Sequence, residues 1–201
     1  MNIVYITIAV EDPLSEAVVR RMLQQSDKNY CVGNCLMRSG FGYLKSKINE
    51  FNKASRKTPF FVLTDQDIGC PPEKINSRFN DSPNSNLIFR IAVMEIESWV
   101  MADRKAIADF LSISVDNFPY KMDEISNPKN FLLTKAKKSR KRKLKNDIIP
   151  VLGSTAKQGP DYNARLSEFI RKNWDVNRAI KYSESLNRAF NRLQEYNPIL
   201  K

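Results

Sequence analysis

A chain of 201 residues with a net charge of +11 can bury one hydrophobic core and carry a small appended part, but it is short for two complete domains. It contains no histidine, which excludes Ser-His-Asp and Cys-His hydrolases, HEXXH proteases and nucleases with histidine-bound metal. Because it also has only three cysteines, we expect no structural zinc site, and any catalysis must use carboxylates, lysines, tyrosines or an oxygen-bound metal.

The first predicted element is a buried strand over residues 3–10, which ends directly before two acids, Glu11 and Asp12. A short run of β-branched and aromatic residues is typical of a strand in a parallel sheet. Asp12 precedes Pro13, and this pair suits the N-cap and the first position of a helix, so capping explains Asp12 better than metal binding does. Glu11 has no such structural role, and it is the first candidate site residue.

The sequence shows no membrane segment and no secretion signal. No window approaches the roughly 18 uninterrupted apolar residues that span a bilayer. The apolar residues 3–10 lack the basic leader and the small-residue cleavage site of a signal peptide. We therefore expect a cytoplasmic protein that does not contact membranes.

A second buried strand is predicted over residues 60–64, and it leads into Asp65, Gln66 and Asp67. In an open α/β sheet the functional crevice lies outside the carboxyl ends of the strands, so we expect Glu11 to lie near both aspartates. Residues i and i+2 of an extended backbone point to one side, which lets Asp65 and Asp67 face one ion. An Asx-type turn at the strand end is the structural alternative for these aspartates.

Clustered carboxylates repel one another unless a cation shares them. Hard divalent cations take oxygen ligands and leave positions open for phosphate. The expected cofactor is therefore Mg²⁺ or Mn²⁺.

A helix near residues 72–79 and a third strand over residues 87–93 come next, and this strand leads into Glu95 and Glu97 within an apolar segment. Two glutamates in such a segment are costly to bury unless they are paired or bind metal. They can equally lie on the surface-facing start of a helix, where acids suit the helix dipole. The sequence leaves both explanations open.

Beyond about residue 118 the strand pattern fades. Residues from 127 onward, residues 162–174 and the last part of the chain show apolar residues at helical spacing, which is typical of core packing. We predict an α/β core over residues 1–115 and a helical C-terminal extension over residues 116–201 that packs on it.

Most of the positive charge lies in one basic segment, residues 135–145, which holds eight basic residues and no acid. The rest of the chain carries a net charge of only +3. Such a run can be a solvated loop or helix face, or it can contact the phosphate backbone of nucleic acid. We favour contact with DNA or RNA, because the acids at the strand ends suit phosphodiester chemistry. The residues expected to contact phosphate are Lys137, Lys138, Arg140, Lys141, Arg142 and Lys143.

The order of parts, a first-strand glutamate, D-x-D after a later strand and acids after a third strand, resembles the Toprim (topoisomerase-primase) fold. More narrowly, residues 10–16, 61–67, 89–93 and 95–103 resemble a family of small stand-alone Toprim-like bacterial proteins known as a domain of unknown function. The resemblance is looser at residues 127–129 and at Lys157. It implies an α/β fold whose mainly parallel sheet has helices on both faces, plus the helical C-terminal part.

The resemblance also implies roles for individual residues. Glu11 would serve in acid-base chemistry or metal binding, and Asp65 and Asp67 would bind metal. An E-x-W element favours Glu97 over Glu95 as a further ligand. Related nucleases of the overcoming-lysogenization-defect type are linked to ATPase partners and anti-phage defence. The chain has no room for the additional domains of topoisomerases and primases, so we expect neither strand passage nor primer synthesis.

Our leading hypothesis is a metal-dependent phosphodiesterase acting on DNA or RNA, with Lys129 or Lys157 as an additional catalytic cation. The alternative is a catalytically inactive subunit that keeps a Toprim-like scaffold and binds nucleic acid or a partner protein, such as an ATPase. Phosphoryl transfer to a small molecule suits the same acids but leaves the basic segment unexplained. The sequence leaves open whether the protein forms a homo-oligomer.

Overall fold

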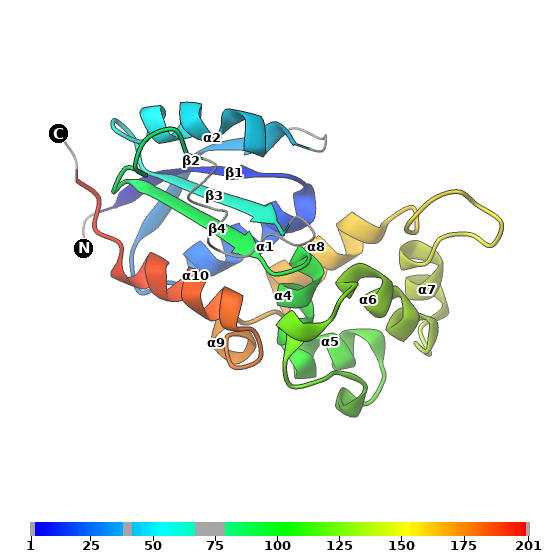
Figure 1. Ribbon diagram of the computed structural model, residues 1–201. Helices are drawn as coiled ribbons and strands as arrows, with labels where there is room; N and C mark the ends of the chain where they lie inside the picture. Colours follow the sequence, from blue (N-terminus) through cyan, green and yellow to red (C-terminus); the bar gives the residue numbers. More distant parts are fainter. Residues whose placement is uncertain (1–2, 38–41, 67–78, 200–201) are drawn as a thin grey trace.

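The computed structural model of the protein describes residues 3–37, 42–66 and 79–199, and its centre is an all-parallel sheet of four strands within these residues (Figure 1). The strand order is β2-β1-β3-β4. The strands are β1 (Val4–Val10), β2 (Tyr30–Met37), β3 (Phe60–Asp65) and β4 (Leu87–Ala92). The expected α/β fold with a mainly parallel sheet is confirmed.

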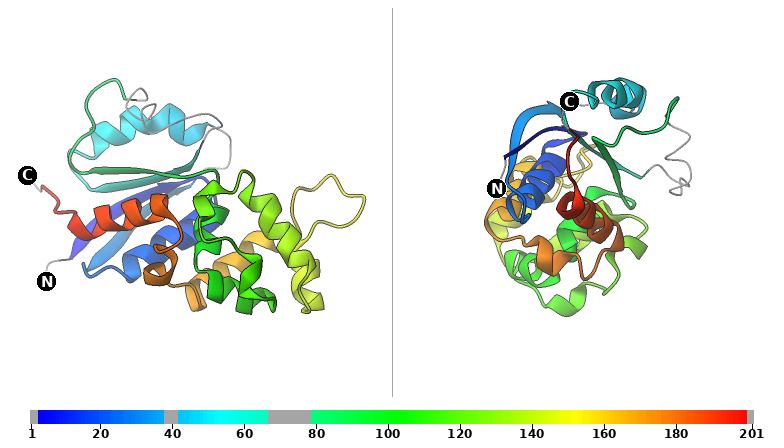
Figure 2. Two further views of the ribbon diagram at one scale, coloured as in Figure 1. Left: turned by 60° about the horizontal axis from the view of Figure 1, so that its bottom comes forward. Right: turned by 90° about the vertical axis from the view of Figure 1, so that its left-hand side faces the viewer.

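Helices cover both faces of this sheet (Figure 2). Helix α2 (Tyr43–Ala54) lies on one face, and α1 (Pro13–Gln24) and α10 (Glu184–Glu195) lie on the other. Alternate residues of a strand point to opposite faces. On β3, Phe60 and Val62 accordingly belong to the apolar cluster under α2, whereas Phe61 belongs to the larger cluster on the opposite side.

Strand β2 is longer than the short strand that its apolar residues suggest. Its pairing with β1 shifts register between Ile6 and Thr7, so Gly33 is the extra residue of a bulge. Strand β2 lies at the edge of the sheet, where polar and half-exposed residues are tolerated. The hydrophobic pattern therefore understates its length.

The rest of the chain is largely helical. Helix α4 follows β4, and the C-terminal helices pack beneath and beside the sheet (Figure 1). These elements are α4 (Ile96–Ala102), α5 (Arg104–Leu111), η1 (Val115–Asn117), η2 (Met122–Glu124), α6 (Pro128–Lys137), α7 (Arg142–Ile148), α8 (Tyr162–Lys172) and α9 (Val176–Ala179). The helix expected near residues 72–79 lies mostly outside the described residues. None of the described helices is long and apolar enough to cross a membrane.

Two buried tryptophans join the helical part to the rest of the core. Trp99 of α4 donates from Nε1 to Ser185 Oγ of α10 at 2.7 Å. Trp174, after α8, donates from Nε1 to the carbonyl of Trp99 at 3.2 Å. Both rings are fully buried in the cluster that also contains Ile6 and Ile8 of β1. The same apolar core therefore extends from the sheet through the C-terminal helices.

The basic segment is folded. It forms the end of α6, a turn and most of α7, and a long loop over residues 149–161 (yellow in Figure 1) then leads to α8. Gly159 fastens the end of this loop to α7, because its N–H donates to the carbonyl of Ile148 at 2.7 Å.

We expect Gly159→Ala to lower the free energy of unfolding by about 1–3 kcal/mol or more. A Cβ at this position would lie 2.4 Å from the carbonyl oxygen of Asp147, and backbone atoms cannot yield as a side chain can. Urea denaturation measures the change. Gly33→Ala is the control, because its Cβ would meet nothing within 4 Å, and a change within about 0.5 kcal/mol is expected there. Equal stability of the two variants would contradict the close packing of the loop on α7.

Candidate functional site

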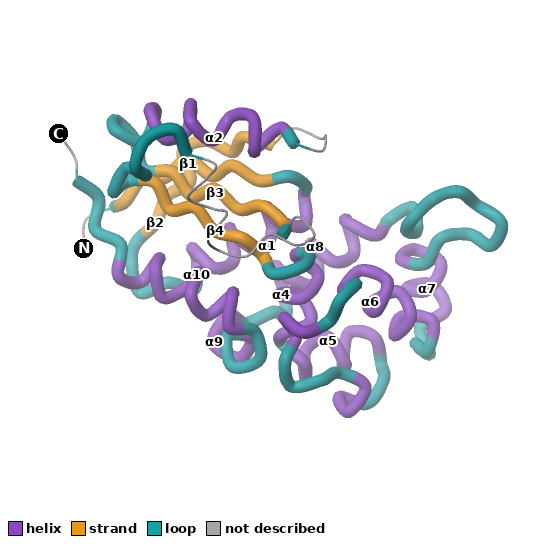
Figure 3. The backbone as a smooth tube through the Cα atoms, in the orientation of Figure 1, coloured by secondary structure: helices purple, strands orange, loops and turns teal. Residues whose placement is uncertain are grey.

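The arrows of β3 and β4 in Figure 1 point toward the side of the molecule where α4, α6 and α8 lie, and β1 runs parallel to β3. Figure 3 shows the helices on this side of the strands in purple. Glu11 follows β1, and Asp65 is the last residue of β3. A short turn after β4 leads to Glu95 and to Glu97 in the first turn of α4. We call this edge of the sheet, with Glu11, Asp65, Glu95 and Glu97, the acidic rim.

Asp65 is at the centre of the acidic rim. Its Oδ1 accepts a hydrogen bond of 2.8 Å from the N–H of Ile96, which joins the end of β3 to the start of α4. Burial raises the pKa of Asp65 well above its usual value, and the negative charges of Glu97, Glu11 and Asp12 raise it further. The structure therefore brings Asp65 within electrostatic reach of acids from the ends of β1 and β4.

Glu11 and Asp12 accept hydrogen bonds from different elements. The hydroxyl of Thr64, the residue before Asp65, donates to Glu11 Oε1, so the end of β1 is tied to the end of β3. Asp12 Oδ1 accepts from the N–H of Ser15 at 2.7 Å and caps α1. The capping role expected for Asp12 is confirmed, and its charge still acts on Asp65.

Glu97 does not lie on a surface-facing helix start. Its side chain is buried, and the residue is 4% exposed. The hydroxyl of Tyr162 donates to Glu97 Oε1 at 2.9 Å, and the Nζ of Lys129 lies 3.9 Å from the same oxygen. Lys129 also lies over the Tyr162 ring, 5.1 Å from its centroid. Burial raises the pKa of Glu97 to about 7, although the Lys129 charge opposes this rise.

Glu95 has a structural role at the start of α6. Its Oε2 accepts from the N–H of Lys129 at 2.8 Å, near the N-terminus of that helix. Acids in this position satisfy free N–H groups and suit the helix dipole. Both glutamates thus contact Lys129: Glu95 accepts from its backbone N–H, and Glu97 lies near its side-chain ammonium.

The turn between β4 and α4 carries backbone strain. Met94 has a φ of 63°, in the left-handed region that costs a non-glycine residue about 1–3 kcal/mol. Its N–H donates to Gln66 Oε1 at 3.2 Å, so the residue after β3 helps to hold the turn. Such strain persists where the surroundings fix it, and here it directs Glu95 and Glu97 to the rim.

Within residues 3–37, 42–66 and 79–199, no three aspartate, glutamate, cysteine or histidine side chains are grouped so that they could hold a metal ion. Asp67, the second expected aspartate, lies outside the described residues. Lys157 is exposed in the 149–161 loop, and no contact between it and the acidic rim is found in the described part of the chain. What the described residues provide is a set of coupled carboxylates, each held by its own hydrogen-bond donor.

A profile of the domain of unknown function DUF4276 matches residues 10–194. The chain belongs to this family. No curated protein and no solved structure is similar enough to match. The region matched by DUF4276 includes the acidic rim as well as Lys129 and Tyr162, so it comprises strands β2, β3 and β4 and the C-terminal helices that contact Glu97.

Sequence reasoning missed Tyr162 and Thr64 as parts of the site of this DUF4276 protein. Tyr162 opens the apolar stripe of α8 and is fully buried, so its spacing alone indicates core packing. In the sequence, Thr64 is one more β-branched residue of the predicted strand, so nothing marks it as part of a site. Neither carries a local signal, because the contact of each with a glutamate arises only in the folded chain.

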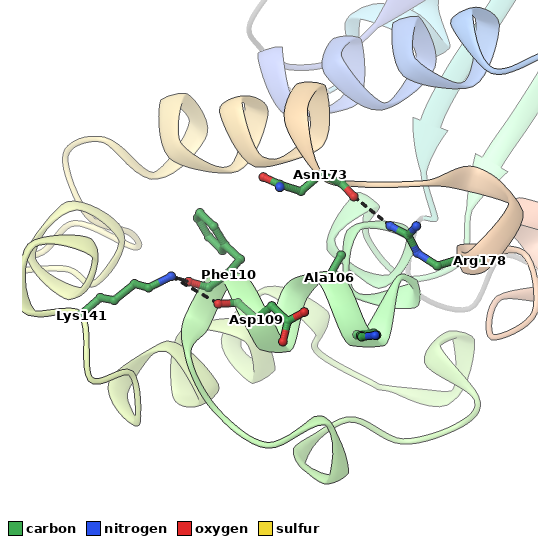
Figure 4. Close-up of a pocket in the computed structure, with 7 residues that line it drawn as sticks. Ala106, Asp109, Phe110, Lys141, Asn173 and Arg178 are labelled. Carbon is green, nitrogen blue, oxygen red and sulfur yellow. Dashed lines mark hydrogen bonds between the residues drawn. The ribbon is translucent and has the colours of Figure 1, made fainter.

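The basic residues divide into two groups. Lys141 Nζ donates to the carbonyls of Asp109 and Phe110 at 3.2 and 2.9 Å, at the end of α5 (Figure 4). Lys138 Nζ donates to Asn117 Oδ1 at 3.3 Å. Both therefore have structural partners. Exposed residues of the segment for which the described chain shows no such partner are Lys137, Arg140, Arg142 and Lys143.

Lys141 also borders a groove of about 470 Å³ between α5, Asn173 and Arg178 (Figure 4). Arg178 is not free to bind a ligand there, because its Nη2 bonds Asp103 Oδ2 at 2.7 Å and the carbonyl of Asn173 at 2.9 Å. The groove is lined by other residues than those of the acidic rim. The groove is therefore separate from the candidate site.

The burial of Glu97 predicts a pH dependence of stability in metal-free protein. The folded state keeps a proton on Glu97 up to a pH of about 7, whereas the unfolded state loses it near 4.5. The free energy of unfolding should therefore fall as the pH rises from 4.5 to 7, by up to about 3 kcal/mol from this group. Urea denaturation in EDTA across this range measures it.

Glu97→Gln keeps an acceptor for Tyr162 but cannot ionise, so we expect a smaller loss of stability with rising pH. Glu195→Gln, at an exposed position on α10, is the matched control and should keep the original slope. Equal slopes in both variants would show that Glu97 is already ionised at pH 5.

Proposed function

We propose that this protein is a metal-dependent phosphodiesterase that acts on DNA or RNA and has a Toprim-like arrangement of acids. The observation that carries the proposal is the electrostatic coupling at the acidic rim. Acids from the ends of two other strands, Glu11 and Glu97, raise the pKa of Asp65. Carboxylates from separate strands that repel one another at a strand-end crevice are what a site for a divalent cation requires.

The acids of the rim suit Mg²⁺ or Mn²⁺, because these ions prefer carboxylate oxygens as ligands. Burial disfavours the charged forms of Asp65 and Glu97, and a bound cation would compensate for that cost. Asp65 would hold the ion together with Glu11 or Glu97 and with Asp67 as a further ligand, since no three of the described acids are grouped closely enough to hold it by themselves. The ion would supply Lewis-acid activation of water and positive charge for the scissile phosphate. This chemistry needs no histidine, in agreement with the composition.

The chain's own residues would do the rest. Lys129 is partly exposed, with 31% of its side chain accessible, and its ammonium lies beside Glu97. It can therefore offset negative charge on a phosphate at the rim. Tyr162 fixes the orientation of Glu97 through its hydrogen bond. We keep Lys129 as the catalytic cation in preference to Lys157, which lies in the exposed loop.

Helix α6 links the acidic rim to the basic segment. Lys129 lies in its first turn and Lys137 at its end, eight residues further, which corresponds to about 12 Å along the axis. A nucleic-acid backbone that reaches the rim could therefore also reach the exposed cations of the basic segment. This arrangement favours a polymer over a small-molecule substrate.

We expect purified protein to cleave plasmid, single-stranded DNA or RNA in Mg²⁺ or Mn²⁺, and Asp65→Asn to lower the rate at least about 100-fold. The substitution removes the charge at the centre of the rim while keeping an acceptor for Ile96. Glu195→Gln, with the same charge change at an exposed position, should keep full activity. Activity that survives Asp65→Asn would indicate a contaminant or another site.

A second candidate is a non-catalytic subunit that binds nucleic acid or a partner protein. It is favoured by the finding that no group of three acids in the described residues is ready to hold a metal. This subunit would bind nucleic acid in EDTA with unchanged affinity after Asp65→Asn and would show no turnover with metal. In either form the protein would act beside an ATPase in anti-phage defence, as the resemblance implies, and we expect it to do so in the cytoplasm.

Both candidates predict salt-sensitive binding through the basic segment. We expect the triple substitution of Lys137, Arg140 and Lys143 to glutamine to weaken binding and to reduce the slope of log affinity against log salt by up to about 3. Fluorescence anisotropy with a labelled oligonucleotide in EDTA measures both quantities. The matched control replaces three exposed lysines elsewhere, Lys53, Lys57 and Lys181. An equal effect of the two triples would show that only net charge matters.

A further inference from the structure

Arg90 on the edge strand β4 has a buried nitrogen without a partner. Its Nη1 donates to the carbonyl of Phe89 at 2.8 Å, but its Nε makes no hydrogen bond. In the part of the chain that the structure describes, this is the one buried side-chain nitrogen or oxygen in that condition. Buried polar groups are nearly always hydrogen-bonded, so such an atom points to a ligand or ion that completes the site.

Two further arginines lie near Arg90. Arg188 and Arg192 are four residues apart on α10 and therefore share one face of the helix, and α10 packs against β4. On β4, Ile88 and Ala92 belong to the same apolar cluster as the buried residues of α10, so Arg90 between them faces the same side. Burial lowers the pKa of Arg90, and the charges of Arg192 and Arg188 lower it further.

The positive charge of these arginines is poorly compensated. Arg188 pairs with Glu184 at 2.6 Å, but both side chains are mostly exposed, so solvent screens this pair. Arg192 lies over the ring of Tyr196, 5.7 Å from its centroid. No carboxylate among the described residues forms an ion pair with Arg90 or Arg192. Three cations therefore converge from two elements, and among the described residues the one acid paired with any of them is the exposed Glu184.

We propose that Arg90, Arg188 and Arg192 form a binding site for a phosphate group. A phosphate offers several oxygens to the guanidinium forks, would give the Arg90 Nε an acceptor, and would offset the like charges. Arg90 lies two residues before Ala92, which pairs with Asp65, so the site is about 7 Å along β4 from the acidic rim. The phosphate can belong to a nucleic-acid backbone or to free phosphate and nucleotides, and the site does not require cleavage at the rim.

An inward-pointing charge on an edge strand also protects the edge against pairing with another sheet. Edge protection would explain the presence of Arg90 but not of Arg188 and Arg192, because a single charge on the strand is enough for it. It predicts that the protein has no specific affinity for phosphate. The two roles are therefore separable by a binding measurement.

The experiment is calorimetric titration of inorganic phosphate into the full-length protein in EDTA at constant ionic strength. We expect saturable binding that weakens about tenfold or more in Arg90→Gln and in Arg192→Gln. Arg171→Gln, with the same charge change on exposed α8 surface, should stay within about twofold of the original affinity. Absence of binding to the folded protein, or equal losses in all three variants, would overturn the site.

Arg90→Lys guards against misfolding of the glutamine variant, because it keeps the charge and removes only the fork. It should fold and bind phosphate more weakly than the original protein; unchanged affinity would contradict the role of the guanidinium. A labelled oligonucleotide in EDTA then identifies the source of the phosphate. A matching loss of oligonucleotide affinity in Arg90→Gln assigns the site to the nucleic-acid backbone, and a loss for inorganic phosphate alone assigns it to free phosphate or nucleotides.

The phosphate site and the proposed phosphodiesterase can fail separately. Asp65→Asn should abolish cleavage and leave phosphate affinity unchanged, because Asp65 does not touch the arginines. If neither the original protein nor any variant cleaves nucleic acid but phosphate binding depends on Arg90, the phosphate site is supported and the phosphodiesterase proposal is contradicted.

Discussion

The burial of the Glu97 carboxylate is the constraint on which the rest of the site depends. A carboxylate that is 4% exposed is costly unless it is hydrogen-bonded and paired. Its two partners come from different helices of the C-terminal part, Tyr162 from α8 and Lys129 from α6. The site therefore exists only when these helices pack against α4, and the C-terminal part is a component of the site rather than an accessory to it.

The acids of the rim are each held by a neighbour from another element. Asp65 is held by the backbone of α4, and Glu11 by the hydroxyl of Thr64 on β3. The strained turn at Met94 brings the β4 side of the rim into place. Strain of this kind must be offset by surrounding contacts, and the bond to Gln66 is one of them. Carboxylates that repel one another are thus kept together by the fold itself.

The sequence predicted those features that depend on local patterns. Runs of apolar residues located β1, β3 and β4 within a residue or so, and the Asp12-Pro13 pair located the start of α1. The extent of β2 could not be read from the apolar residues, because an edge strand needs only half of the hydrophobic pattern. The burial of Glu97 and the role of Tyr162 could not be read from the chain, because each depends on packing between α4 and α8, about 65 residues apart.

The charges of the molecule are separated along α6. Glu95 accepts a hydrogen bond from the N–H of Lys129 in its first turn, and Lys135 and Lys137 occupy its last turn, so the charges at both ends suit the helix dipole. If the basic segment lay against the acidic rim, its cations would pair with the carboxylates and lower the pKa of Asp65 rather than leave it raised. The length of α6 prevents this neutralisation, except at Lys129. The negative charge of the rim is therefore not neutralised by the basic segment and can attract a metal cation. The exposed cations of the basic segment likewise stay available to an anionic partner.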